Sequence, residues 1–340
     1  MFGELSNKMI FYRLIIFFVW TGSLNTTNRD LFSLDPFASP HNLDRELHSL
    51  LAQASSNLCD WFAETGSKSP MPESFELPEV YPAKEGVSNN VLLSELKLLM
   101  NGSYRPSHPG SLAHLDPPPL SASIVGDLIC AGLNNNLLAE ELSPSLSSLE
   151  RNLCKWFCKR LGFGDLSGGV AASGGSLSNL MALVMARNIS GLESDPDAVF
   201  FASDDCHVSF SKALRIMGLK QESLQKVPTD ENGQLQISSL RSSLNKIRSE
   251  GKKCFAVVAT AGTTVRGAID PLSEIVQFCK KEKVWLHVDG AIGGIYGLST
   301  KTSEIVQGLG SADSITVNPQ KLLGIAKTSS LLLVANKNNL

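Results

Sequence analysis

Short apolar runs alternate with amphipathic segments in the second half of the chain, starting near residue 168. Continuous apolar runs predict buried strands at 198–203, 254–262, 284–291 and 314–318. Helical spacing predicts helices at 180–188, 212–219, 237–251 and 270–283. Such alternation is typical of a mostly parallel sheet covered by helices on both faces. The pattern therefore predicts an α/β fold, in which ligands bind at the carboxyl ends of the strands.

The first part of the chain has a different hydrophobic pattern, without the alternation of apolar runs and amphipathic segments. Apolar residues recur at roughly helical spacing over 41–64 and again around 88–100, and the proline-rich stretch 71–86 favours an extended linker. Three parts are therefore expected along the chain: an N-terminal extension (1–40), a helical segment (41–100) and a large α/β domain (101–340).

Composition excludes several classes of function. The net charge of −3 and the lack of a long run of one sign argue against nucleic-acid binding. The chain has seven cysteines and no CxxC motif. Cys154 and Cys158 are four residues apart, but no histidine cluster is near enough in sequence to complete a metal site. We therefore expect reduced cysteines, no bound metal and a cytoplasmic location.

One apolar run, Met9–Trp20, bears on location. It is interrupted by Arg13 and is shorter than the roughly 20 residues of a membrane-spanning helix. Basic residues accompany it, as in a signal peptide, yet no cleavage-site pattern follows. We expect no stable membrane insertion, with export or anchoring as the minority alternative.

Residues capable of chemistry follow the predicted strands. Gly174, Gly175 and Ser176 precede a helix, where free N–H groups and the helix dipole attract phosphate. Alone, this segment favours an ordinary helix-capping loop. Asp289 ends an apolar strand; it fits a helix cap or an ion pair, or the carboxylate partner that the protonated ring nitrogen of pyridoxal phosphate requires. Ala291, after Gly290, leaves space for a flat ring.

Three further residues extend this set. His207 suits an ordinary helix start or a position against a cofactor ring, and Thr264 suits a turn or a position beside the cofactor. Lys321 is an amine that can bond covalently to a carbonyl, whereas Lys327 is expected to be a surface lysine. Each residue has an ordinary structural explanation, but their common position at strand ends favours one pyridoxal phosphate site.

The motifs that carry these residues resemble those of a known family. The stretches SGGSLSNLMALVMARN, ATAGTTVRGAIDPL, WLHVDGAIGG and ADSITVNPQK, in this order, are similar to the group II pyridoxal-phosphate-dependent decarboxylases. That family includes glutamate, aromatic-amino-acid, cysteine-sulfinate and diaminobutyrate decarboxylases. The resemblance runs from about Asn101 to Leu340 and implies an aspartate-aminotransferase-like fold, a homodimer with active sites at the interface, and decarboxylation of an L-amino acid.

The resemblance also implies a role for each residue. Lys321 would form the Schiff base with pyridoxal 5′-phosphate, Asp289 would pair with the ring nitrogen, and His207 would stack on the ring. Gly175, Ser176 and Asn318 would lie near the phosphate. Thr264 and Ala291 would contact the cofactor, and His114 and Pro117 would face the substrate.

The sequence departs from the family pattern in two places. Gln320 stands before the lysine where the family has histidine, and its amide, unlike an imidazole, does not take up a proton. The chain ends soon after Lys321, so we expect the C-terminal small domain and a mobile catalytic loop to be missing. Two alternatives to a decarboxylase stay open: a catalytically incomplete or inactive paralogue, and another lyase or transaminase on the same fold. The sequence does not identify the substrate.

Overall fold

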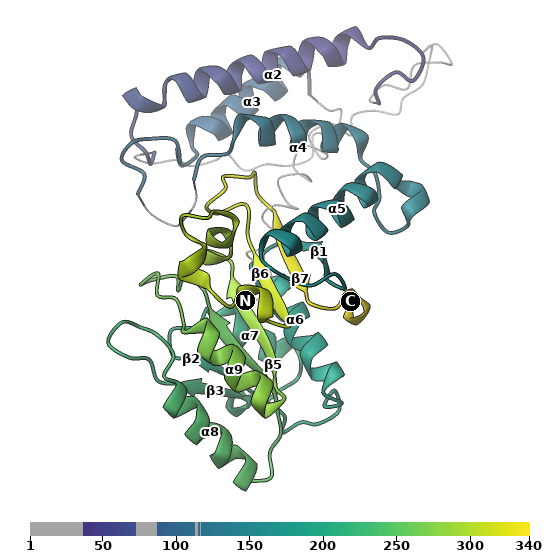
Figure 1. Ribbon diagram of the computed structural model, residues 1–340. Coiled ribbons are helices and arrows are strands. Elements are labelled where there is room, and N and C mark those ends of the chain that lie inside the picture. Colours follow the sequence, from purple (N-terminus) through teal and green to yellow (C-terminus); the bar gives the residue numbers. More distant parts are fainter. Residues whose placement is uncertain (1–36, 73–86, 113–114, 116) are drawn as a thin grey trace. The chain divides into compact units, whose positions relative to one another are not determined.

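The computed structural model describes residues 37–72, 87–112, 115 and 117–340 (Figure 1). The chain divides into two compact units, residues 1–114 and residues 115–340. The predicted linker 71–86 lies almost entirely outside the described residues, as does the apolar run Met9–Trp20.

Two amphipathic helices, α2 (Arg45–Ala63) and α3 (Asn89–Asn101), form the described part of the first unit. The Asp44 carboxylate accepts the N–H of Leu47 at 2.8 Å and caps α2, and the Ser88 hydroxyl caps α3. Both helices lie where the hydrophobic spacing predicted them.

Arg105 stabilises the first unit from inside. Its guanidinium lies 4.6 Å from the ring centre of Trp61, donates to the Trp61 carbonyl at 2.8 Å and reaches the Thr65 hydroxyl at 3.3 Å. It is 5% exposed, so this arginine is buried although it lies in a proline-rich loop. Burial is tolerated because an aromatic face and two oxygens surround the charge.

A single seven-stranded sheet organises the described part of the second unit, in the order β1-β7-β6-β5-β4-β2-β3. The strands are β1 (Gly168–Ala172), β2 (Val199–Ser203), β3 (Leu224–Val227), β4 (Cys254–Thr260), β5 (Trp285–Gly290), β6 (Ser314–Val317) and β7 (Ser330–Val334). Strands β3, β2, β4, β5 and β6 pair in parallel, and β7 is antiparallel to both neighbours. The predicted α/β class with a mostly parallel sheet is confirmed.

Helices cover both faces of this sheet. They are α5 (Pro144–Arg160), α6 (Gly175–Ile189), α7 (Ser209–Ile216), α8 (Ile237–Ser249) and α9 (Leu272–Glu282). Helix α4 (Ser121–Leu133) comes before them in the chain and contributes no buried residue. Alternate residues of β2 show the two layers: Phe201 packs in one core with α5, α8 and α9, whereas Phe200 packs in another with α6 and α7. Phe200 contacts Phe210 and Phe255, with ring centres 6.4 Å and 5.5 Å away.

Short 3₁₀ segments connect these elements. They are Thr65–Ser67, Glu140–Leu142, Gln221–Ser223, Gly293–Leu298, Ser303–Val306, Leu309–Ser311 and Lys337–Asn339. Because β2, β4, β5 and β6 run in parallel, their carboxyl ends share one edge of the sheet. The loops after these strands carry most of the predicted site residues.

Candidate cofactor site

Asp289 occupies the end of β5, level with Thr260 of β4 and Thr316 of β6. Its carboxylate is buried but has hydrogen-bond partners: Oδ1 accepts the N–H of Ala291 at 3.2 Å, and Oδ2 accepts the side-chain amide of Asn179 at 3.0 Å. These donors offset the cost of burying an ionised group. A Cβ at Gly290 would lie 2.9 Å from the carbonyl oxygen of Thr316. Its lack of a side chain serves strand packing.

His207 lies just before α7, after β2. The backbone N–H of Ser209 donates to His207 Nδ1 at 3.2 Å, and the Ser209 hydroxyl lies 2.9 Å from the same nitrogen. Since a backbone N–H can only donate, Nδ1 carries no proton, and a neutral imidazole must carry its proton on Nε2. Burial lowers the pKa of His207, and the positive charges of Lys321 and Lys212 lower it further against the raising effect of Asp289.

A chain of hydrogen bonds joins these two residues. From His207 it passes to the Ser209 hydroxyl, from there to Asn179 Nδ2 at 3.1 Å, and from Asn179 to Asp289. The charges of Asp289 and Lys321 both act on the imidazole of His207. The structure therefore brings together the end of β5, the start of α7 and the loop after β6.

The start of α6 lies against Asn318. A Cβ at Gly175 would be 2.7 Å from Nδ2 of Asn318 and 3.1 Å from its Oδ1. No side chain caps α6, whose first residues therefore offer backbone N–H groups, and Ser176 is exposed there. Oδ1 of Asn318 is buried and has no hydrogen-bond partner among the described residues. The three residues predicted near a phosphate thus lie at one helix start and the adjacent strand end.

Lys321 lies in a turn directly after β6, where its N–H donates to the carbonyl of Asn318 at 3.0 Å. Its neighbour Gln320 uses its side-chain oxygen to accept the N–H of Ser329 at 2.6 Å, which connects the loop to the start of β7. Lys327 is exposed, as expected of a surface lysine.

The segment before α4 packs on the loop that follows Lys321. Gly324 accepts the N–H of Leu120 at 2.7 Å, and the Ser123 hydroxyl accepts the N–H of Ala326 at 2.7 Å. Pro117, one of the two residues predicted to face the substrate, is half-buried three residues before Leu120. The other, His114, lies outside the described residues.

Thr264 is exposed in the turn after β4, and Ala291 is buried beside Asp289. The buried threonine of that turn is Thr263, whose hydroxyl accepts the N–H of Ala268 at 3.1 Å and stabilises the turn. Of these two residues, Ala291 is hydrogen-bonded to Asp289 through its backbone N–H.

Three residues that sequence reasoning had not singled out complete the network. They are Asn179 in α6, Ser209 in α7 and His287 in β5, all nearly or fully buried. Burial lowers the pKa of His287 to about 4, against weaker opposing effects of Asp289 and Ser314. One signal was available: Asn179 is four residues after Gly175, so it lies on the same face of α6 one turn further on.

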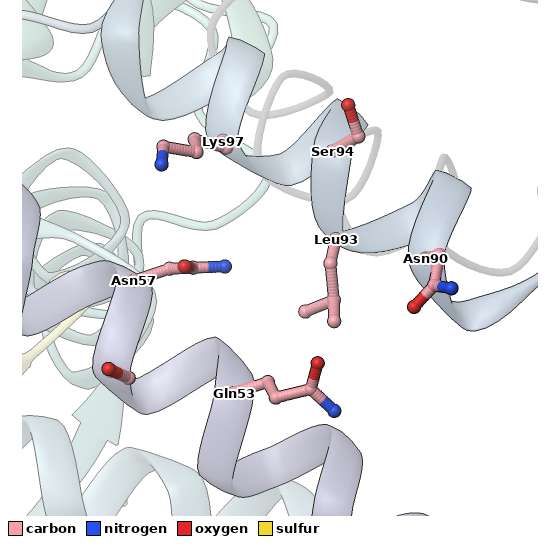
Figure 2. A pocket seen from close by; sticks show the side chains of 7 residues that line it. Gln53, Asn57, Asn90, Leu93, Ser94 and Lys97 are labelled. Atoms are coloured by element: carbon pink, nitrogen blue, oxygen red, sulfur yellow. The ribbon is translucent and has the colours of Figure 1, made fainter.

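A separate groove occurs in the first unit, between α2 and α3, with a volume of about 380 Å³. Figure 2 shows its lining, which consists of Gln53, Ser56, Asn57, Asn90, Leu93, Ser94 and Lys97. It contains none of the predicted site residues. Within the described ranges, no group of His, Cys, Asp and Glu side chains is placed to hold a metal ion. Across those same ranges, every helix is too short or too polar to cross a bilayer.

Comparison with known proteins identifies the family. Residues 72–340 match the pyridoxal-dependent decarboxylase conserved domain. The chain is 36% identical over 233 residues to the aromatic-L-amino-acid decarboxylase of Bacillus atrophaeus, covering 68% of this chain and 48% of that protein. It is 31% identical over 294 residues to the cysteine sulfinic acid decarboxylase of Rattus norvegicus, covering 84% and 58% respectively. The chain belongs to the pyridoxal-dependent decarboxylase family, and it spans about half the length of these curated relatives.

Solved structures agree with this assignment. The crystal structure of mouse CSAD superposes with a TM-score of 0.81 at 28% identity, covering 87% of this chain and 65% of that one. The glutamate decarboxylase domain of a Vibrio parahaemolyticus protein gives a TM-score of 0.79 at 26% identity, covering 86% and 67%. The family implies pyridoxal 5′-phosphate as cofactor.

The described residues fit this cofactor chemically. Phosphate oxygens accept N–H groups, which the uncapped start of α6 supplies. A protonated ring nitrogen needs a carboxylate, and Asp289 holds one at the end of β5. An aldehyde carbon needs an amine, and Lys321 provides one after β6. The Nδ2 group of Asn318 lies beside the start of α6 and is a donor of the kind that a phosphate oxygen accepts.

Proposed function

We propose that residues 115–340 bind pyridoxal 5′-phosphate and that the whole protein decarboxylates an L-amino acid to the corresponding amine and carbon dioxide. One observation carries this proposal. Asp289 and His207 are joined by a continuous hydrogen-bond chain, and the charge of Lys321 acts on the same imidazole, in a fold of the pyridoxal-dependent decarboxylase family.

When bound, pyridoxal phosphate supplies an electron sink for the electron pair that a departing carboxylate leaves behind. The chain's own residues would prepare that sink. Asp289 provides a buried negative charge that favours a proton on the ring nitrogen. Lys321 would provide the amine that holds the cofactor covalently.

Other residues would bind and orient. Gly175, Ser176 and Asn318 are assigned to the phosphate, and the close contact between Gly175 and Asn318 supports a shared site. His207, neutral and protonated on Nε2, is assigned to the face of the cofactor ring. A neutral imidazole adds no charge there, so Asp289 alone would set the protonation of the ring nitrogen.

Some assignments rest mainly on the family. Thr264 and Ala291 are placed beside the cofactor, and His114 and Pro117 on the substrate side. The packing of the Pro117 segment against the loop after Lys321 supports the second placement.

We further infer a homodimer in the cytoplasm. Helix α4 has no buried residue, and it exposes an apolar stripe at helical spacing, formed by Val125, Leu128, Ile129 and Leu133. A second copy of the chain would cover this stripe. All seven cysteines are free, which supports a reducing compartment.

The test separates binding from turnover. Purified protein is titrated with pyridoxal phosphate, reduced with borohydride and digested, and mass spectrometry then locates the pyridoxyl group. We expect it on Lys321. Carbon dioxide and keto acids are next measured with a panel of L-amino acids. Carbon dioxide release supports the decarboxylase, keto acid favours a transaminase, and binding without either product supports an inactive family member. Failure to bind the cofactor refutes the proposal.

A further inference from the structure

The carboxamide of Asn179 is the branching point of the buried network beside Asp289. Its Nδ2 donates to Asp289 Oδ2 at 3.0 Å and to the Ser209 hydroxyl at 3.1 Å, while its Oδ1 lies 3.0 Å from Nε2 of His287. A carboxylate only accepts hydrogen bonds, so the NH₂ group must face Asp289. The carbonyl oxygen of Asn179 is thereby turned toward His287.

This orientation determines the tautomer of His287. The Asn179 oxygen can only accept, so Nε2 of His287 must carry the proton and Nδ1 must be an acceptor. The Ser314 hydroxyl lies 2.9 Å from Nδ1 and is itself the acceptor for the indole N–H of Trp285 at 2.9 Å. Ser314 is thus free to donate its own proton to Nδ1, and every group in the series has a partner of the right kind.

The same amide also acts toward His207. By occupying an acceptor position of the Ser209 hydroxyl, Asn179 directs the hydroxyl proton toward Nδ1 of His207, where the backbone N–H of Ser209 already donates. Both imidazoles are therefore held neutral and protonated on Nε2. Burial, which disfavours the charged form of both rings, acts in the same direction.

We propose that Asn179 is a positioning residue of the cofactor site: one carboxamide fixes the direction of the Asp289 carboxylate and the Nε2–H tautomers of His207 and His287. The consequence for the cofactor rests on the proposed function, whereas the tautomers are a property of the protein alone. A purely structural residue at this buried position of α6 would need only to fill the volume, as leucine does.

The protein without cofactor tests the tautomers. Chain labelled with ¹⁵N-histidine is examined by long-range proton–nitrogen NMR, with His207→Gln and His287→Gln used for assignment. We expect both rings to be neutral and protonated on Nε2. A wild-type His287 that is protonated on Nδ1, or on both nitrogens at neutral pH, overturns the proposal without any variant.

Substitutions then test the hydrogen bond between Asn179 and His287 separately from the other bonds of the network. Asn179→Leu removes the acceptor of the Nε2 proton of His287. His287 should therefore no longer be held in the single Nε2–H form, and a measurable fraction of the Nδ1–H tautomer should appear. Ser178→Ala is the matched control, because Ser178 is equally buried in α6 but bonds to Thr316 and to the Leu331 carbonyl. It should leave the Nε2–H tautomer in place.

Two milder substitutions keep the test decisive if Asn179→Leu does not fold. Asn179→Asp retains the acceptor toward His287 but sets a second carboxyl group against Asp289, so the His287 tautomer should persist while cofactor affinity falls. Ser209→Ala should disturb only His207.

Cofactor binding provides the second readout. The dissociation constant for pyridoxal phosphate should rise about tenfold or more in Asn179→Leu and Asn179→Asp, a change equivalent to one charge-assisted hydrogen bond, and stay within about twofold in Ser178→Ala. Unchanged affinity in both Asn179 variants refutes the positioning role. If wild-type protein binds no cofactor, the proposed function fails, and the NMR result still decides the tautomers.

Discussion

Gly175 and Asn318 are in contact at the start of α6, with so little space that a Cβ on Gly175 would lie 2.7 Å from the Asn318 side chain. The start of α6 and the end of β6 can therefore approach this closely only because residue 175 has no Cβ. We assign both residues to the phosphate of the cofactor, so their separation should control cofactor affinity.

Gly175→Ala should weaken pyridoxal phosphate binding about tenfold or more, because either Asn318 or the first turn of α6 must move. Affinity is measured by absorbance titration. Gly164→Ala is the matched control, since no atom lies within 4 Å of a Cβ there. Equal affinities for pyridoxal phosphate in the two variants would contradict the assignment of the phosphate to Gly175 and Asn318.

Lys321 and Lys327 provide an internal comparison within one loop. Lys321→Ala should abolish the visible absorbance band and the borohydride-fixed pyridoxyl group, because the covalent amine is gone. Lys327→Ala, at an exposed position, should retain both. A band that survives in Lys321→Ala would assign the amine elsewhere.

Asp289→Asn should separate binding from chemistry. The amide has nearly the shape of the carboxylate but no charge to favour a protonated ring nitrogen, so we expect cofactor binding to persist and turnover to fall by about 100-fold or more. Asp289→Ala should behave similarly, with weaker binding. Carbon dioxide release is measured beside the absorbance titration. Full turnover in either variant would contradict the electron-sink role.

The strands that sequence pattern predicted share one property: β2, β4, β5 and β6 are continuous apolar runs buried on both faces. Strand β1 was not predicted because it contains two glycines and two alanines, which give little β signal. Strand β3 is four residues long and includes Gln225 and Lys226. The leucine-rich β7 is equally compatible with a helix when read alone.

The site divides in the same way. Asp289, His207 and Lys321 could be predicted because each follows a strand, and the carboxyl ends of parallel strands share an edge. Asn179 could not, because its contact with Asp289 joins residues 110 positions apart across a helix and a strand. Local pattern predicts the face of α6 on which Asn179 lies, but the side chain it meets depends on tertiary packing.

The last prediction concerns the effect of pH on stability. The folded chain holds the pKa of the buried His287 at about 4, against an ordinary value of 6.5. Between these values the unfolded chain binds a proton that the folded chain does not, so the stabilising contribution of His287 is complete above pH 6.5 and is lost as pH falls toward 4. The slope is about 1.4 kcal/mol per pH unit, and the total loss is about 3 kcal/mol.

His287→Gln removes this titration and retains a donor toward Asn179. Urea unfolding of the wild type and His287→Gln between about pH 4.5 and pH 7 should therefore give free energies of unfolding that converge or cross as pH falls.

Asp270, whose pKa burial raises to about 6, acts with the opposite sign, because its contribution to the free energy of unfolding is lost as pH rises from 3.8 to 6. It is present in both proteins and cancels in the difference. His48→Gln, an exposed change in α2, should leave the wild-type pH profile unaltered. Parallel profiles for wild type and His287→Gln would show that His287 is not held neutral by burial.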